Sequence, residues 1–307
     1  FQRSLVMKEN KAALWAVITG NAVFGFSFLF SKLALAVASP AVLIAVRFTV
    51  AFLVLSAVVF IGKSIRRRDG RPLVSFSLRG KPLKNVLLLA LFQPVIYFIA
   101  ENYGIVYTSS SFAGILIAII PITGIMLDVL ILRTKVSAKQ VLCAICSVAG
   151  VVLTTVGAKD MNSSFKGLVL LLIAVLSGSL FYVFSKKTAG DYSALERTYV
   201  MFGIGSVFYV ALALASSAHD FHQLIVYPLS QPVFWVSILY LSVISSVVAF
   251  LLLNYGSGYV SVSKASLFAN ISTAISVFAG VLILKESFSV WQALGAAVIL
   301  TSVYFAA

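Results

Sequence analysis

The sequence predicts an all-α integral membrane protein with ten transmembrane helices, arranged as two inverted five-helix repeats. Three observations predict this fold class. Hydrophobic residues make up 61% of the 307 residues and charged residues only 10%, whereas soluble domains carry about a quarter charged residues. Ten apolar runs are long enough to cross a bilayer, and the second half of the chain repeats the first. A chain this apolar needs lipid as its solvent.

Each apolar run is predicted to be one helix, because a transmembrane helix needs about 20 apolar residues. The runs are continuous and show no period-two alternation, which excludes the strands of a membrane barrel. Most connections are short, so neighbouring helices should be antiparallel, with no room for a soluble domain. The predicted spans are approximately Ala12–Ala36, Pro40–Ile61, Asn85–Tyr103, Ser109–Leu132, Ser137–Val156, Gly167–Ser185, Ala194–Ser216, Pro232–Tyr255, Ser263–Leu284 and Ser289–Ala306.

The basic residues set the expected orientation. The longest connection, residues 62–84, holds eight Lys and Arg residues. If this connection is cytoplasmic, 18 of the 23 Lys and Arg residues lie on or near the cytoplasmic side. The positive-inside bias therefore predicts that both termini are cytoplasmic. The segment Ser217–Gln231 is then external, and we interpret its His219 and His222 as parts of a solvated loop rather than as metal ligands.

The second half of the chain aligns with the first half at a shift of 152 residues. Tyr103 falls on Tyr255, and the four residues 129–132 recur unchanged at 281–284. The first helix of each copy aligns at a shift of 154 residues, where Phe30-Ser31-Lys32 falls on Phe184-Ser185-Lys186. Because each copy has five spans, an odd number, the second copy must enter the membrane inverted. Inverted repeats are typical of carriers that bind their substrate near the membrane midplane.

The repeat divides the chain into residues 7–159 and 160–307. Phe1–Val6 is interpreted as the remnant of a cleavable tag, with Met7 as the native start. The first apolar run is full length and has no clear processing site, so no cleavable signal peptide is expected.

Several other function classes are disfavoured. The net charge of +14 suggests nucleic acid, but the basic residues sit between apolar runs, as topogenic charges do. Cys143 and Cys146 form a CxxC motif without a second cysteine pair or a nearby histidine, so a helix face is expected there rather than a metal or redox site. The chain contains no GxxxxGK[ST] motif and no convergent catalytic set. We expect neither an ATP-driven pump nor an enzyme, and no cofactor.

Several motifs occur in a fixed order along the chain: Trp15, the aromatic-glycine stretch 24–28, Lys32, Pro40, Arg47, the segment Tyr103–Pro121, and Leu284-Lys285-Glu286 followed by Gly295. In this order and spacing the sequence resembles the drug/metabolite transporter superfamily, of the EamA type. The resemblance implies ten helices around a central cavity lined by the first, third, fourth, sixth, eighth and ninth, with the fifth and tenth peripheral. It also implies export or exchange of small metabolites, often amino acids, across the bacterial inner membrane.

Glu101 is the leading candidate for substrate contact, because an ionisable group inside a membrane is expensive. Gln93, Tyr97 and Glu101 are spaced i, i+4, i+8 and should form one stripe on a helix, with Asn102 beside it and Pro94 loosening the backbone. We interpret the stripe as a polar cavity wall in which Glu101 accepts an amine, another cation or a proton. The alternative is a carboxylate that reaches the external interface or pairs with a basic residue.

Each of the other candidate residues has one interpretation as a substrate contact and one as a structural residue. Arg47 either binds a substrate carboxylate or pairs with Glu101, and Lys264 either contacts an anionic substrate or anchors its helix at the cytoplasmic side. Aromatic residues deep in their spans either stack on a substrate or pack in the core. The complete set of candidate substrate-binding residues is Glu101, Tyr97, Gln93, Asn102, Asn21, Phe26, Phe181, Tyr182, Asn270, Lys264 and Arg47.

The sequence therefore favours a secondary carrier that works by alternating access. The leading function is export or exchange of an amino acid or a similar small amphiphile. An organic-cation carrier anchored by Glu101, and an antiporter for a phosphorylated anion that would need clustered Lys and Arg, remain open as alternatives. The expected partners are a small-molecule substrate, the lipid bilayer and, for coupling, protons. Neither nucleic acid nor an obligatory protein partner is indicated.

Overall fold

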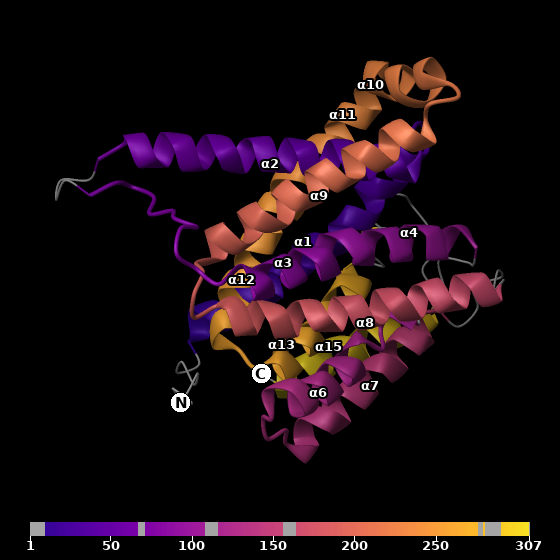
Figure 1. Ribbon diagram of the computed structural model, residues 1–307. Helices are drawn as coiled ribbons and strands as arrows, with labels where there is room; N and C mark the ends of the chain where they lie inside the picture. The colour runs from indigo at the N-terminus through magenta and orange to yellow at the C-terminus, as the bar shows by residue number, and fades with distance from the viewer. Residues whose placement is uncertain are drawn as a thin grey trace.

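Long apolar helices dominate the part of the chain that the structure describes (Figure 1). This computed structural model describes residues 10–66, 71–107, 116–155, 164–275, 279 and 290–306. These ranges contain no β-strand, and six helical stretches within them are long and apolar enough to cross a membrane. The six are α1 (Lys11–Leu35), α2 (Pro40–Ser64), Leu83–Gly104, α8 (Phe165–Thr188), α9 (Ala194–Ser216) and Pro232–Tyr259.

Two of these stretches are assembled from several segments. The first contains α3 (Leu83–Ala90), η1 (Leu91–Ile96) and α4 (Tyr97–Val106), and the second contains α11 (Pro232–Leu239), η4 (Tyr240–Val248) and α12 (Ala249–Tyr259). The shorter helices are α6 (Ile120–Leu127) with η2 (Asp128–Leu132), α7 (Ala138–Thr155), η3 (His222–Val226), α10 (Tyr227–Ser230), α13 (Val262–Leu267) with η5 (Phe268–Asn270), and α15 (Val290–Ala306).

The observed helices begin and end within a few residues of the predicted spans wherever a whole span is described; α9 covers Ala194–Ser216, as predicted. The predicted spans Ser109–Leu132 and Ser263–Leu284 lie partly outside the described residues, as do the tag remnant and the junction of the two predicted repeats. The predicted loop Ser217–Gln231 is wrong in part, because it contains η3 and α10. These turns form because Ile225 and Leu229 pack against the hydrophobic core.

Local sequence accounts for several helix starts. Ser39 precedes Pro40 at the first position of α2, and the Ser39 hydroxyl accepts a hydrogen bond from the amide of Val42 at 3.4 Å. At the start of α9, Ser193 and Glu196 form a reciprocal capping box.

The carboxylate of Glu196 also fixes the basic connection between α2 and α3. It accepts hydrogen bonds from the amide of Ser77 at 2.8 Å and from Lys81 Nζ at 2.5 Å. The hydroxyl of Tyr192 adds a contact by donating to the carbonyl of Pro82 at 3.2 Å. The connection is therefore held against the start of α9.

The third long helix is interrupted in its middle. Gln93 has non-helical backbone angles (φ −144°, ψ 121°), and Pro94 follows inside η1. Two carbonyl groups at this break, which also accept from the amide of Tyr97, are bound by side chains from other helices. Ser177 of α8 donates to the carbonyl of Phe92 at 2.7 Å, and the hydroxyl of Tyr209 of α9 donates to the carbonyl of Pro94 at 2.8 Å. Irregular backbone at membrane depth requires such partners.

Helices from the first part of the chain pack on helices from the second part. α2 lies along α9, and α7 lies along α15 (Figure 1). α1 packs on α12, α4 on α8, and α6 on α13. Aromatic rings fill the middle of the bundle: the ring centroid of Phe48 lies 5.2 Å from that of Phe98, 5.4 Å from Phe202 and 5.5 Å from Tyr209.

Candidate functional site

Glu101 lies on α4, inside a helix of membrane-spanning length, and remains partly exposed. One turn earlier, the hydroxyl of Tyr97 donates a hydrogen bond to Glu101 Oε1 at 2.8 Å. This i, i+4 contact orients the carboxylate. No described residue donates a hydrogen bond to the second oxygen, Oε2. The structure therefore orients the carboxylate through one of its two oxygens.

Arg47 is a buried cation near this carboxylate. Its Nε donates to Ser246 Oγ at 2.9 Å and its Nη2 donates to Ser245 Oγ at 3.0 Å. The guanidinium also lies over the ring of Phe98, 5.1 Å from the centroid. Arg47 and Glu101 interact electrostatically. The direct ion pair considered from the sequence does not form, because the serine hydroxyls hold the guanidinium beyond ion-pair distance.

The serines connect Arg47 to a third helix. Ser245 Oγ lies 2.5 Å from Ser27 Oγ of α1. Hydrogen bonds thus join α1, α2 and η4 at one depth of the bundle. We call Ser27, Arg47, Tyr97, Glu101, Ser245 and Ser246 the central polar cluster.

Two further predicted residues border this cluster. Tyr97 packs against α8 at Gly178, one turn before Tyr182, and Asn21 of α1 lies beside the Tyr182 hydroxyl. The side-chain amide of Asn21 also donates to the carbonyl of Val17 at 2.9 Å. The structure therefore brings together Asn21, Arg47, Tyr97, Glu101 and Tyr182, which come from four different helices.

Four predicted residues have other surroundings. Phe181 is 1% exposed, and its ring centroid lies 5.9 Å from that of Phe250, in the aromatic core. Asn102 donates to the carbonyl of Phe98 at 2.7 Å, within its own helix. Phe26 is 38% exposed on α1.

Gln93, the fourth, is buried at the helix break. The prediction of one continuous stripe from Gln93 to Glu101 is therefore wrong at its first residue. Pro94 has no amide hydrogen and its ring crowds the preceding turn, so it weakens the helix at this point.

The last two predicted residues lie where α6 meets α13 and η5. The side-chain amide of Asn270 donates to the carbonyl of Ala118 at 3.3 Å and to Ser147 Oγ at 2.9 Å. Lys264 is partly exposed in the first turns of α13, and its backbone amide donates to Ser261 Oγ at 3.3 Å. Asn270 thus faces neighbouring helices rather than the central polar cluster.

α6 and α13 make their closest contact beside these residues. Asp128 Oδ2 accepts hydrogen bonds from the amide of Ser263 at 3.0 Å and from its hydroxyl at 2.7 Å. One turn away, a Cβ atom built on Gly124 would lie 2.6 Å from Ser266 Oγ, so only glycine fits. We call Gly124, Asp128, Ser263 and Ser266 the α6–α13 seam.

Sequence reasoning missed Ser245, Ser246 and Tyr240. Tyr240 stacks on Phe30 with centroids 4.0 Å apart, and its hydroxyl donates to the carbonyl of Val23 at 3.0 Å. A signal for the serines is present: hydroxyl residues recur three and four apart within an apolar run, at Ser242, Ser245 and Ser246. This spacing marks one face of a helix.

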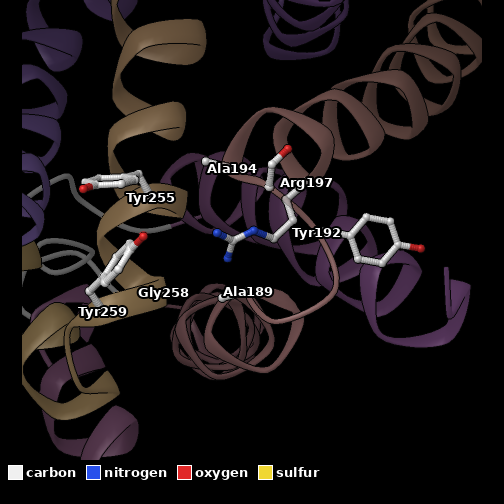
Figure 2. Close-up of a pocket in the computed structure, with 8 residues that line it drawn as sticks. Ala189, Tyr192, Ala194, Arg197, Tyr255, Gly258 and Tyr259 are labelled. Carbon is white, nitrogen blue, oxygen red and sulfur yellow. The ribbon is translucent and has the colours of Figure 1, made fainter. Parts of the chain in front are cut away.

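Sequence reasoning also missed a pocket where α8 and α12 end and α9 begins (Figure 2). Its volume is about 200 Å³, and Arg197 reaches into it from the first turn of α9. Burial raises the pKa of the Tyr192 phenol above its ordinary value. The lining residues are Ala189, Tyr192, Ser193, Ala194, Arg197, Tyr255, Gly258 and Tyr259.

A second, mostly apolar groove lies between α7 and α15. Cys143 and Cys146 line it, together with Lys139 and residues of α15. Its place between two outer helices suits lipid chains better than a polar ligand. Within the described ranges, no group of three or more His, Cys, Asp or Glu side chains is placed to hold a metal ion.

Comparison with known proteins gives consistent matches. The model of the EamA-like transporter family matches residues 10–156 and 165–307. The uncharacterized transporter YcxC of Bacillus subtilis (strain 168) is 33% identical over 302 residues, covering 97% of this chain and 94% of YcxC. An uncharacterized transporter of Archaeoglobus fulgidus is 23% identical over 94% of this chain and 97% of its own length. A protein of known crystal structure shares the fold, with a TM-score of 0.76 at 16% identity over 97% of this chain and 96% of that one.

Proposed function

We propose that the protein is a secondary carrier for a small amphiphile with an amino group. The chain belongs to the EamA-like transporter family, so it is a multi-pass membrane transporter rather than an enzyme. The observation that carries this proposal is the Glu101 carboxylate, oriented by Tyr97 inside a membrane-length helix. An ionisable group within a membrane span is costly and is typically kept for function.

The proposed architecture is ten spans in two inverted copies. The helix pairing supports it. At a shift of about 152 residues, α4 corresponds to α12 and α1 to α8, so the α4–α8 contact and the α12–α1 contact are equivalent. The same shift relates α2 to α9 and α7 to α15, and the two helices of each pair pack on each other. The family model also matches two separate ranges, one in each proposed copy. Inverted copies support alternating access, with the halves rocking around a site near the midplane.

The central polar cluster favours an amino acid as the substrate. Glu101 offers an amine its Oε2, to which no side chain in the described ranges donates. Arg47 uses two of its five N–H donors on Ser245 and Ser246, and the others are available for a carboxylate. Two opposite charges near each other, at a site surrounded by aromatic rings, match a zwitterion with an apolar side chain.

An organic cation is the second candidate substrate. Tyr97 donates a hydrogen bond to Glu101, and Tyr182 borders the same cluster on α8. Aromatic faces next to a carboxylate attract quaternary or protonated amines. Counterflow with an amino acid and with a carboxyl-free amine distinguishes the two candidates, because only the amino acid engages Arg47.

Replacing Glu101 with Gln tests the proposal. In proteoliposomes, we expect Glu101→Gln to lower substrate counterflow at least about tenfold, since a charged hydrogen bond worth about 1.5–3 kcal/mol is lost. Asp220→Asn, which removes an exposed carboxylate outside the spans, is the matched control and should transport normally. Counterflow by Glu101→Gln equal to that of the control would sink the assignment of Glu101.

The proposed location is the bacterial inner membrane, with both termini and residues 62–84 in the cytoplasm. The basic residues of this connection support the orientation through the positive-inside bias. Single cysteines placed at Arg79 and at His219 should label from opposite sides of intact cells. Labelling of both from the outside would contradict the proposed orientation.

A further inference from the structure

Arg197 is buried with part of its hydrogen-bonding capacity unused. Its Nη1 donates to the carbonyl and the hydroxyl of Ser185, and its Nη2 donates to the carbonyl of Asn254. These three bonds hold the ends of α8 and α12 together. A guanidinium carries five N–H donors, so two remain, and Nε is buried without an acceptor. Nε is closed off from solvent, so the donor left for an oxyanion is the second N–H of Nη2.

No counter-charge accompanies this cation in the described part of the chain. Arg197 is 2% exposed, and no described carboxylate lies within ion-pair distance of it. The neighbouring Glu196 is directed elsewhere, to Lys81 and to the amides of Ser77 and Ser193. A buried charge without a partner is strongly unfavourable. A bound anion would supply the missing charge.

The pocket beside Arg197 has room for such an anion. Figure 2 shows the guanidinium between α8 and α12, with the hydroxyl of Tyr259 directed toward the same space and those of Tyr192 and Tyr255 directed away. The volume of about 200 Å³ holds a small polar group rather than a whole metabolite. Lys186 lies at the same end, where its Nζ donates to the carbonyl of Gly258 at 3.0 Å. The surroundings are thus basic as well as hydroxyl-bearing.

We propose that this pocket binds a phosphate group, separately from the transported substrate at the central polar cluster. A guanidinium charge pairs well with phosphate, and the pocket lies at the ends of three membrane-length helices, where lipid headgroups are found. The phosphate comes from an anionic lipid or from a soluble phosphate compound. This site goes beyond the proposed transport function and does not depend on it.

Thermal unfolding of the purified full chain in detergent tests the site. The probes are phosphatidylglycerol, phosphatidylcholine and inorganic phosphate, the last compared with sodium chloride at equal ionic strength. Two variants alter the pocket: Arg197→Gln removes the charge, and Ala189→Leu fills the space while leaving the Arg197 contacts in place. Ala211→Leu, on the exposed side of α9, is the control for added bulk.

We expect phosphatidylglycerol to raise the melting temperature of the wild type more than phosphatidylcholine does, with half-saturation about tenfold weaker in both pocket variants. Stabilisation by inorganic phosphate as well identifies a soluble source, and stabilisation by the lipid alone identifies the membrane. If Arg197→Gln fails to fold, Ala189→Leu decides. The proposal is overturned if no probe stabilises the wild type, or if Ala189→Leu responds like Ala211→Leu. Because no transport is measured, this result is independent of the proposed carrier function.

Discussion

Arg47 shows how a buried cation can be accommodated without a direct ion pair. Two different nitrogens reach two serine hydroxyls, Ser246 at 2.9 Å and Ser245 at 3.0 Å, while the flat face lies against the ring of Phe98. Lysine offers a single nitrogen and no planar face, so it cannot reproduce this geometry.

Arg47→Lys should therefore destabilise the protein although it keeps the charge. We expect a loss of about 2 kcal/mol, from one or two broken hydrogen bonds and a hydroxyl left without its donor. The melting temperature in detergent measures it. Arg79→Lys, at an exposed position outside the spans, should melt like the wild type. Equal melting temperatures for the two variants would show that the serine contacts contribute nothing.

At the scale of residues, the sequence reveals charges more readily than their partners. Glu101 and Arg47 stand out because ionisable groups are rare in apolar runs. Ser245 and Ser246 do not stand out, since serine is common at helix–helix contacts in membranes. Asn270 is one of the candidate residues, but its hydrogen bonds to Ala118 and Ser147 depend on which helices become neighbours, and a local sequence pattern carries no information on that.

The α6–α13 seam is a close approach between two helices, made possible by Gly124. A methyl group there would lie 2.6 Å from the hydroxyl oxygen of Ser266 and 2.8 Å from its Cβ atom. Neither atom can move far, because both belong to a short side chain in the middle of the contact.

Gly124→Ala should force α6 and α13 apart and cost about 1–3 kcal/mol of stability. The double variant Gly124→Ala, Ser266→Gly removes both clashing atoms and should recover most of the loss. Comparing the melting temperatures of the single and double variants checks the contact. A double variant as unstable as Gly124→Ala alone would place the clash somewhere other than Ser266.

At the scale of helices, most boundaries follow from sequence, because caps such as Ser39 and the Ser193–Glu196 box act locally. The break at Gln93 does not. Pro94 predicts a weak point, but the full departure from helical angles is supported by Tyr209 and Ser177, which lie over 80 residues away along the chain. Long-range hydrogen bonds of this kind leave no local pattern.

For the molecule as a whole, the pairing of helices places the seam between the two proposed copies, since α6 belongs to one and α13 to the other. Alternating access requires the copies to move relative to each other. A covalent bond across the seam should therefore stop transport.

A cysteine pair tests this requirement. In a chain with Cys143→Ala and Cys146→Ala, the variant Asp128→Cys, Ser263→Cys should lose counterflow on oxidation and regain it on reduction. The two side chains face each other across the seam, with Asp128 Oδ2 2.7 Å from Ser263 Oγ. Each single-cysteine variant should be unaffected by oxidation. Full transport by the cross-linked protein would exclude movement at this seam.

The Asp128–Ser263 contact has a further consequence for a carrier made of two copies. At a shift of 152 residues, Gly280 stands where the first copy has Asp128, so the sequence provides no second carboxylate for the mirror contact. Hydrogen bonds to a charged group contribute about 1.5–3 kcal/mol, which corresponds to roughly tenfold or more in an equilibrium constant. Under the proposed alternation, the empty carrier would rest mainly in the state closed at Asp128. Part of the binding free energy of the substrate would then be used to offset the free-energy difference between the two states of the carrier. This difference sets a lower limit on the affinity of any substrate able to drive turnover.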